Sequence, residues 1–207
     1  MTIGELAVLR TGLVTTRTKR TAGGSDEYRY TMLNLKCISQ DGGIDLTQTE
    51  PYFLSKPLKD DYFTKSGDIL VRLSTPYTPI LISKSEWCGL LVPSHFAIIR
   101  AKLPLALPEY LYWTLCREKN RITFMQNCSG SHVLGTIGAG VIASLPVTQL
   151  PLEQQRTLGQ IMLLAEKEQQ LLDRLSREKK KYNTLLLNQI YGTMKGGVRS
   201  DAQTEDR

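Results

Sequence analysis

Residues 145–161 read "LPVTQLPLEQQRTLGQI", and this stretch joins a body of short elements to a long helical segment. Proline is excluded from a helix interior but suits the first turn, where its missing N–H would have no partner. Pro151 therefore predicts a helix start, and Glu153 suits the positive end of the helix dipole. We expect Pro146 and Pro151 together to make the junction rigid.

The segment from about Leu152 to Tyr191 carries apolar residues in a seven-residue rhythm, interrupted by Glu168, Lys179 and Gln189. Forty helical residues would extend about 60 Å, too far for the helix to bury its apolar seam alone. No other stretch of the chain predicts a helix of that length, so we expect a partner helix and a homodimer or hetero-oligomer. The first two turns are also expected to pack on the body, and Lys179 to select register or partner. The predicted seam residues are Leu158, Ile161, Ala165, Leu172, Leu175, Tyr182 and Leu186.

The first hundred residues read as short strands separated by glycine turns. The expected strands are "IGELAVL", "YTMLNLKCI", "GDILVRL", "PILISK" and "HFAIIRAK". In the third, Ile69 and Val71 alternate with Leu70 and Arg72, which predicts one fully buried and one partly buried face. Residues 107–125 have helical spacing after Pro108, and the glycine-rich residues 127–147 are expected to form turns between short strands.

These patterns predict an α+β protein, with a mixed α/β body at 1–150 and one long C-terminal coiled-coil helix at 151–191. The small, polar residues 192–207 are expected to be a disordered tail. No stretch approaches the roughly 20 apolar residues of a membrane span, and the N-terminus lacks an export signal, so we expect a cytoplasmic protein without a membrane partner.

The formal net charge of the 207 residues is +6, and the excess lies mainly on the body. Residues 10–20 carry four basic side chains and no acidic one, which permits a polyanionic partner. The four cysteines form no CxxC pair and the two histidines are far apart, so we expect reduced thiols and no metal site.

Signatures of catalysis are missing from the sequence. The stretch "STPYTP" at 74–79 lacks the acid and the adjacent second proline of an amino-methyltransferase motif, and the chain holds no Walker or GxSxG pattern. A substrate-facing loop is a better interpretation of this stretch. An enzyme with an unrecognised site, such as a nuclease or small transferase, remains an alternative.

The chain resembles the specificity (S) subunits of type I restriction–modification systems. The resemblance covers about residues 65–175 and lies in the order of four stretches. These are "SGDILVRLSTPYTPILIS", "HFAIIRAK", "LPEYLYWTLCREKNRITFM" and "CSGSHVLGTIGAGVIASLPVTQLPLEQQRTLGQIM". Each stretch alone is weak evidence for the family, but the order and spacing of all four are not explained by chance.

The resemblance implies a non-catalytic target recognition domain that reads one half of a bipartite site in double-stranded DNA. It also implies a helix that packs antiparallel against a second such helix. Family members carry two recognition domains and two helices, and this chain has one of each, so it resembles a half-length form that homodimerises. The implied partners are a methyltransferase (M) subunit, which holds S-adenosylmethionine, and a restriction (R) nuclease subunit; this chain itself is expected to bind no cofactor.

DNA contacts are expected from the basic residues and from four loops of the body. Arg72 could instead be a structural ion-pair partner, and the basic residues could be solvated surface. A coiled-coil adaptor that never touches DNA is a further alternative. The expected phosphate contacts are Arg10, Arg17, Lys19, Arg20, Arg29 and Lys84. The candidates for base contact are Thr15, Tyr28, Tyr30, Arg72, Ser74, Thr75, Tyr77, Thr78, Ser129, Ser131 and His132.

Overall fold

The computed structural model describes residues 1–15, 28–39, 42–129 and 135–201. Its elements fall into two units, Met1–Met162 and Leu163–Arg207. The strands are β1 (Ala7–Thr11), β2 (Tyr28–Met32), β3 (Glu50–Leu54), β4 (Ile69–Arg72), β5 (Pro79–Leu81) and β6 (Phe96–Ala101). The helices are α1 (Ile3–Leu6), α2 (Pro108–Cys116), α3 (Glu118–Gln126), α4 (Ala139–Ala143) and α5 (Leu152–Asp201). Single 3-10 turns occur at Leu35–Cys37, Leu46–Gln48, Asp60–Tyr62 and Ser85–Trp87.

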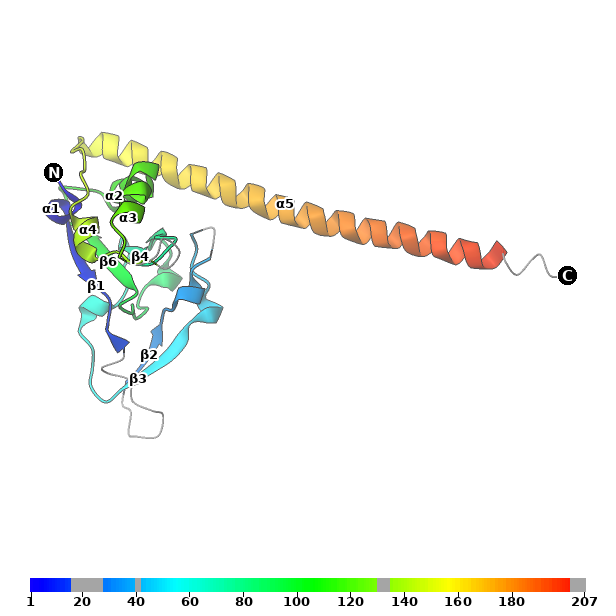
Figure 1. Ribbon diagram of the computed structural model, residues 1–207, viewed down its shortest axis with the longest axis horizontal. Helices are drawn as coiled ribbons and strands as arrows, with labels where there is room; N and C mark the ends of the chain where they lie inside the picture. Colours follow the sequence, from blue (N-terminus) through cyan, green and yellow to red (C-terminus); the bar gives the residue numbers. More distant parts are fainter. Residues whose placement is uncertain (16–27, 40–41, 130–134, 202–207) are drawn as a thin grey trace. The chain divides into compact units, whose positions relative to one another are not determined.

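An antiparallel four-stranded sheet, with the order β1-β6-β4-β5, forms the centre of the first unit (Figure 1). A separate two-stranded ribbon pairs β2 with β3. Ile69, Leu70 and Val71 of β4 are fully buried, and Arg72 is half-buried. The predicted burial of this strand is therefore confirmed. Each of the three apolar side chains contributes about 1.5–3 kcal/mol through burial.

Residues 3–6 form the helix α1 where we expected the start of a strand. The backbone N–H of Thr2 donates to Oε2 of Glu5 over 2.6 Å, as in a capping box. The pattern Thr2-x-x-Glu5 was therefore the decisive local signal, and the strand β1 begins only at Ala7. In the same way, the second expected strand ends at Met32 and its remainder contains the turn Leu35–Cys37.

The helix expected over 107–125 is divided at Arg117, whose ψ of 136° is extended. Asn120 is buried and donates from Nδ2 to the carbonyl of Thr114 over 2.6 Å. This bond satisfies an acceptor that a continuous helix would have used internally, so α2 ends and α3 begins in a new direction. The helix α2 packs against β5 and β6.

The first residues of the chain pair with the segment that precedes α5. Thr2 forms a bridge with Pro146, the Ile3 N–H donates to the Leu145 carbonyl, and the Val147 N–H donates to the Met1 carbonyl. The short helix α4 lies just before this segment, where we expected only turns and short strands, and it contacts α1 and β1. The first and last segments of the body, residues 1–3 and 145–147, are therefore paired with each other.

The helix α5 begins at Leu152, as predicted, and the carbonyl of Pro151 accepts from the Gln155 N–H. It runs to Asp201, past Tyr191, where we expected it to end and a disordered tail to begin. Glycine lowers helix propensity by about 1 kcal/mol but does not terminate a helix by itself. The glycines after Tyr191 therefore led us to predict the end of the helix too early. Residues 202–207 of the expected tail lie outside the described residues. None of the described helices is long and apolar enough to cross a membrane.

Packing of the first turns of α5 against the body involves different residues from those expected. Gln155 and Gly159 are buried, whereas Leu158 is half-buried and Ile161 is 59% exposed. A Cβ at Gly159 would lie 2.5 Å from Cβ of Glu109 in α2, closer than two carbons can approach. Gly159 therefore permits α5 and α2 to pack closely.

Replacing Gly159 with alanine is expected to lower the free energy of unfolding by about 1–3 kcal/mol, despite the gain in helix propensity, because α5 and α2 must move apart. Urea denaturation measures the change. Gly192→Ala is the matched control, since no atom lies within 4 Å of its added Cβ and only the propensity gain remains. Equal stability of the two variants would contradict the close packing at Gly159.

Candidate nucleic-acid interface

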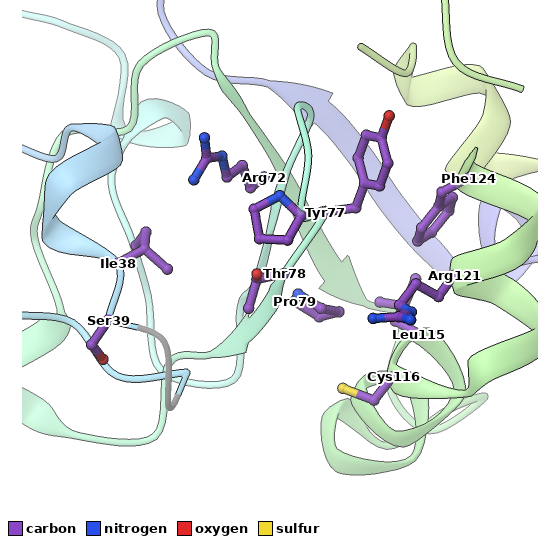
Figure 2. A pocket seen from close by; sticks show the side chains of 11 residues that line it. Ile38, Ser39, Arg72, Tyr77, Thr78, Pro79, Leu115, Cys116, Arg121 and Phe124 are labelled. Carbon is purple, nitrogen blue, oxygen red and sulfur yellow. The ribbon is translucent and has the colours of Figure 1, made fainter. Parts of the chain in front are cut away.

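The turn between β4 and β5 borders a pocket of about 650 Å³, which we call the Arg72 pocket. Figure 2 shows this turn in the middle of the view, with Ile38 and Ser39 on one side and side chains of α2 and α3 on the other. No acidic side chain of the described chain lines it. The lining residues are Ile38, Ser39, Arg72, Pro76, Tyr77, Thr78, Pro79, Leu115, Cys116, Arg121 and Phe124.

Arg72 lies at the end of β4, and its Nε donates to Oγ of Ser74 over 3.0 Å. It makes no ion pair with any residue that the structure describes, so the ion-pair interpretation has no support there. The second guanidinium, Arg121, reaches the pocket from α3 and forms an exposed ion pair with Glu118. Exposed ion pairs of this kind are weak, so the Arg121 guanidinium can still bind a ligand, as can that of Arg72.

Tyr77 has a φ of 55°, in the left-handed region that non-glycine residues rarely occupy. Its ring packs against Phe124 at a centroid distance of 6.0 Å, and its hydroxyl donates to the Gly135 carbonyl over 3.0 Å. Burial raises the pKa of the Tyr77 phenol further above its ordinary value. Tyr77 is only 3% exposed, so it holds the turn in shape and its hydroxyl is not free for a base, contrary to our expectation.

Two of the predicted loops meet at Thr136. Ser74 and Ser129 each form a bridge with this residue, and the Ile137 N–H donates to the carbonyl of Leu73. The turn with Thr75 and Thr78 therefore lies beside the segment that begins at Ser129. The other two predicted residues of that loop, Ser131 and His132, lie outside the described residues.

The aromatic residues of β2 form a second cluster. Tyr28 and Tyr30 stack with a centroid distance of 6.5 Å, and Tyr30 packs on Phe63. Thr15 also lies here, because its carbonyl accepts from the hydroxyl of Tyr52, the residue opposite Tyr30 in β3. The structure thus brings the first and second predicted loops together. The basic candidates Arg17, Lys19 and Arg20 of the first loop are outside the part that the structure describes.

The other predicted phosphate contacts are engaged within the protein to different degrees. Arg10 forms an ion pair with Asp61 at 2.6 Å and lies over the Tyr62 ring, which reduces its value as a phosphate ligand. Arg29 is exposed and lies 5.9 Å from the Phe53 ring, and Lys84 is exposed with Nζ 4.5 Å from the Trp87 ring. A cation over a ring keeps its charge, so these two remain candidates.

Sequence reasoning missed Arg121, Ser39 and Phe124 as neighbours of Arg72. Arg121 is 49 positions away along the chain, and its helix shows no local charge signature. Only the fold of α2 and α3 beside the turn brings these residues to the same pocket.

Comparison with known proteins gives solved structures only, since no protein-family model and no curated protein matches the sequence. An HsdS subunit from Thermoanaerobacter tengcongensis aligns with a TM-score of 0.55 and 20% identity, over 90% of this chain and 46% of that one. A chain from a study of complex assembly and conformational transition of the type I restriction–modification system aligns with a TM-score of 0.62 and 18% identity, over 94% of this chain and 48% of its own. This chain thus spans about half the length of these structures, and it has the fold of about half of a type I specificity subunit, as its sequence resemblance predicts.

Proposed function

We propose that this chain is a non-catalytic, sequence-specific DNA-recognition subunit of a type I restriction–modification complex. One observation carries the proposal. In a fold like half of an S subunit, the turn that follows Arg72 lies beside a second loop at a pocket. Among the described residues, Arg72 forms no ion pair and no acidic side chain lines this pocket. A guanidinium can bind a phosphate or the edge of a guanine in a bidentate manner, and hydroxyls such as Thr78 add further contacts.

In this proposal the chain dimerises through α5, so that two copies read the two halves of a bipartite, palindromic site. Its exposed apolar residues, which include Leu172, Leu175 and Tyr182, support an α5 that needs a partner. The dimer recruits a methyltransferase subunit, which binds S-adenosylmethionine, and a nuclease subunit can join the same assembly. The half-sites then face one side of the duplex, about one or two helical turns of 34 Å apart.

The test is selection of a binding site from random double-stranded DNA, followed by affinity measurements over a range of salt. We expect one enriched bipartite sequence, and an affinity that falls by about 10³-fold between 50 and 200 mM salt if six or more phosphates are contacted. No binding, or binding without dependence on salt, would favour the adaptor instead. Methylation or cleavage of DNA by the purified chain with S-adenosylmethionine and magnesium would favour the enzyme.

Arg72→Ala is expected to weaken binding to the selected site by about 5- to 150-fold, because a bidentate guanidinium contact is lost. Loss of base preference at one position would identify a base contact, whereas a salt slope lower by about one would identify a phosphate contact. Arg156→Ala is the control. Arg156 pairs with Glu153 on α5 and does not line the pocket, so this substitution removes the same charge at another place. Equal effects of the two variants would contradict a specific role for Arg72.

A further inference from the structure

The seam of α5 contains two charged residues among exposed apolar ones. Ile161, Leu172, Leu175, Tyr182 and Leu186 are 41–64% exposed. Glu168 interrupts them and lines one hollow of the helix surface with Leu164, Lys167, Leu171, Leu172 and Leu175. Lys179 interrupts the same seam about three turns further on.

These two charges form no ion pair within the described residues, and what sets them apart from other unpaired charges on the helix is their place in the apolar seam. Glu178 pairs with Lys181 at 3.1 Å, whereas Glu168 and Lys179 form no ion pair in that part of the chain. Covering the seam removes Glu168 and Lys179 from water, which is costly unless each meets an opposite charge. The occupant of the seam must therefore supply a cation against Glu168 and an anion against Lys179.

A second copy of this helix supplies both charges in an antiparallel arrangement. The seam positions are 158, 161, 165, 168, 172, 175, 179, 182, 186 and 189, at alternating steps of three and four. A two-fold axis between residues 173 and 174 pairs every position with another seam position, since each pair adds up to 347. Leu172 then faces Leu175, Ala165 faces Tyr182, and Glu168 faces Lys179.

Other arrangements of two copies lack this match. A parallel pair in register sets Glu168 against Glu168 and Lys179 against Lys179. An antiparallel pair shifted by one heptad sets Glu168 against Leu172 or Leu186, which leaves the carboxylate buried without a partner. The pattern is therefore self-complementary in one orientation and one register.

We propose that a second copy of this chain covers the seam antiparallel, in the register that pairs Glu168 of each copy with Lys179 of the other. This inference rests on the dimer of the proposed function and adds its register; the antiparallel orientation is the one that the resemblance already implies. Leu164, Leu171 and Leu185, which are 56–68% exposed, flank the seam and widen the apolar contact. The overlap from Leu158 to Gln189 extends about 47 Å along the helix.

The experiment exchanges the charges and measures the dimer dissociation constant by sedimentation. Glu168→Lys sets two lysines face to face twice per dimer, and Lys179→Glu does the same with glutamates, so each variant alone should dimerise about 100-fold or more weakly than wild type. Mixed in equal amounts, the two variants should form a heterodimer with an affinity within about threefold of wild type, because all four facing charges are then opposite. Lys180→Glu, next to the seam, is the control and should stay within about threefold of wild type.

The outcomes separate the register from the dimer. A wild-type dimer whose two variants stay dimeric, or whose mixture is not restored, overturns the register and leaves the dimer of the proposed function intact. A wild-type chain that is monomeric at high concentration overturns both. Restoration on mixing also shows that both variants fold, so misfolding cannot imitate the expected result.

Discussion

Replacement of Asp68 by alanine is expected to lower the free energy of unfolding by about 2–4 kcal/mol. Asp68 precedes β4 and is 1% exposed. Its two carboxylate oxygens accept from Nε and Nη2 of Arg100 in β6, each over 2.7 Å, and Oδ2 also accepts from the Lys65 N–H. The hydrogen bonds that Arg100 donates to Asp68 raise the pKa of Arg100, because they favour its charged form. Without the carboxylate, the half-buried guanidinium loses both hydrogen bonds, and its 4.0 Å contact with the half-exposed Asp61 is a weak substitute.

Urea denaturation followed by circular dichroism measures this loss. Asp60→Ala is the matched control, because Asp60 also binds a cation, Lys65, at 2.8 Å but is exposed. The stability of this control should stay near that of wild type, since water replaces the lost partner. An equally large loss in both variants would show that burial of Asp68 does not determine its contribution.

Gln155→Leu is expected to cost about 2–4 kcal/mol, although leucine has a similar volume. The side chain of Gln155 is 2% exposed. Its Oε1 accepts from the Leu107 N–H over 2.9 Å, and its Nε2 donates to the carbonyls of Leu150 and Leu105 over 2.9 and 3.4 Å. Leucine would leave these buried backbone groups without partners in the segments that lead into α2 and α5.

The adjacent residue gives the control for this prediction. Gln154 is exposed, so Gln154→Leu should change the free energy of unfolding by less than about 0.5 kcal/mol. Limited proteolysis of the segment 148–151 gives a second readout, which should accelerate in Gln155→Leu alone. Equal cleavage of both variants would contradict a role of Gln155 in holding this segment.

Local patterns in the sequence were sufficient to predict the burial and the bounds of an element where these depend on that element's own residues. The alternation around Ile69–Arg72 predicted the burial of β4, and Pro151 predicted the start of α5. The capping pattern at Thr2 and Glu5 was present in the sequence, but the apolar residues that follow favoured a strand. The break at Arg117 depends on a side-chain bond of Asn120 that periodicity does not reveal.

The candidate interface was only partly predictable, because it is assembled by tertiary contacts. The sequence indicated Arg72 and the loops at Ser74 and Ser129, yet only the bridges to Thr136 place these loops together. The buried contacts of Gln155 and Gly159 were missed for a related reason. A glutamine and a glycine on a polar helix carry no apolar signal, although they are the residues that face α2 and the segment before it.

The pairing of Met1–Ile3 with Leu145–Val147 has a consequence for synthesis of the protein. A nascent chain cannot complete its body until residue 147 has left the ribosome, because Val147 donates to the carbonyl of Met1. The leucines of α5 follow later in translation, at about 5–20 residues per second. The body is thus able to start folding before the exposed leucines of α5 have been synthesised, which shortens the time in which unfinished chains could aggregate.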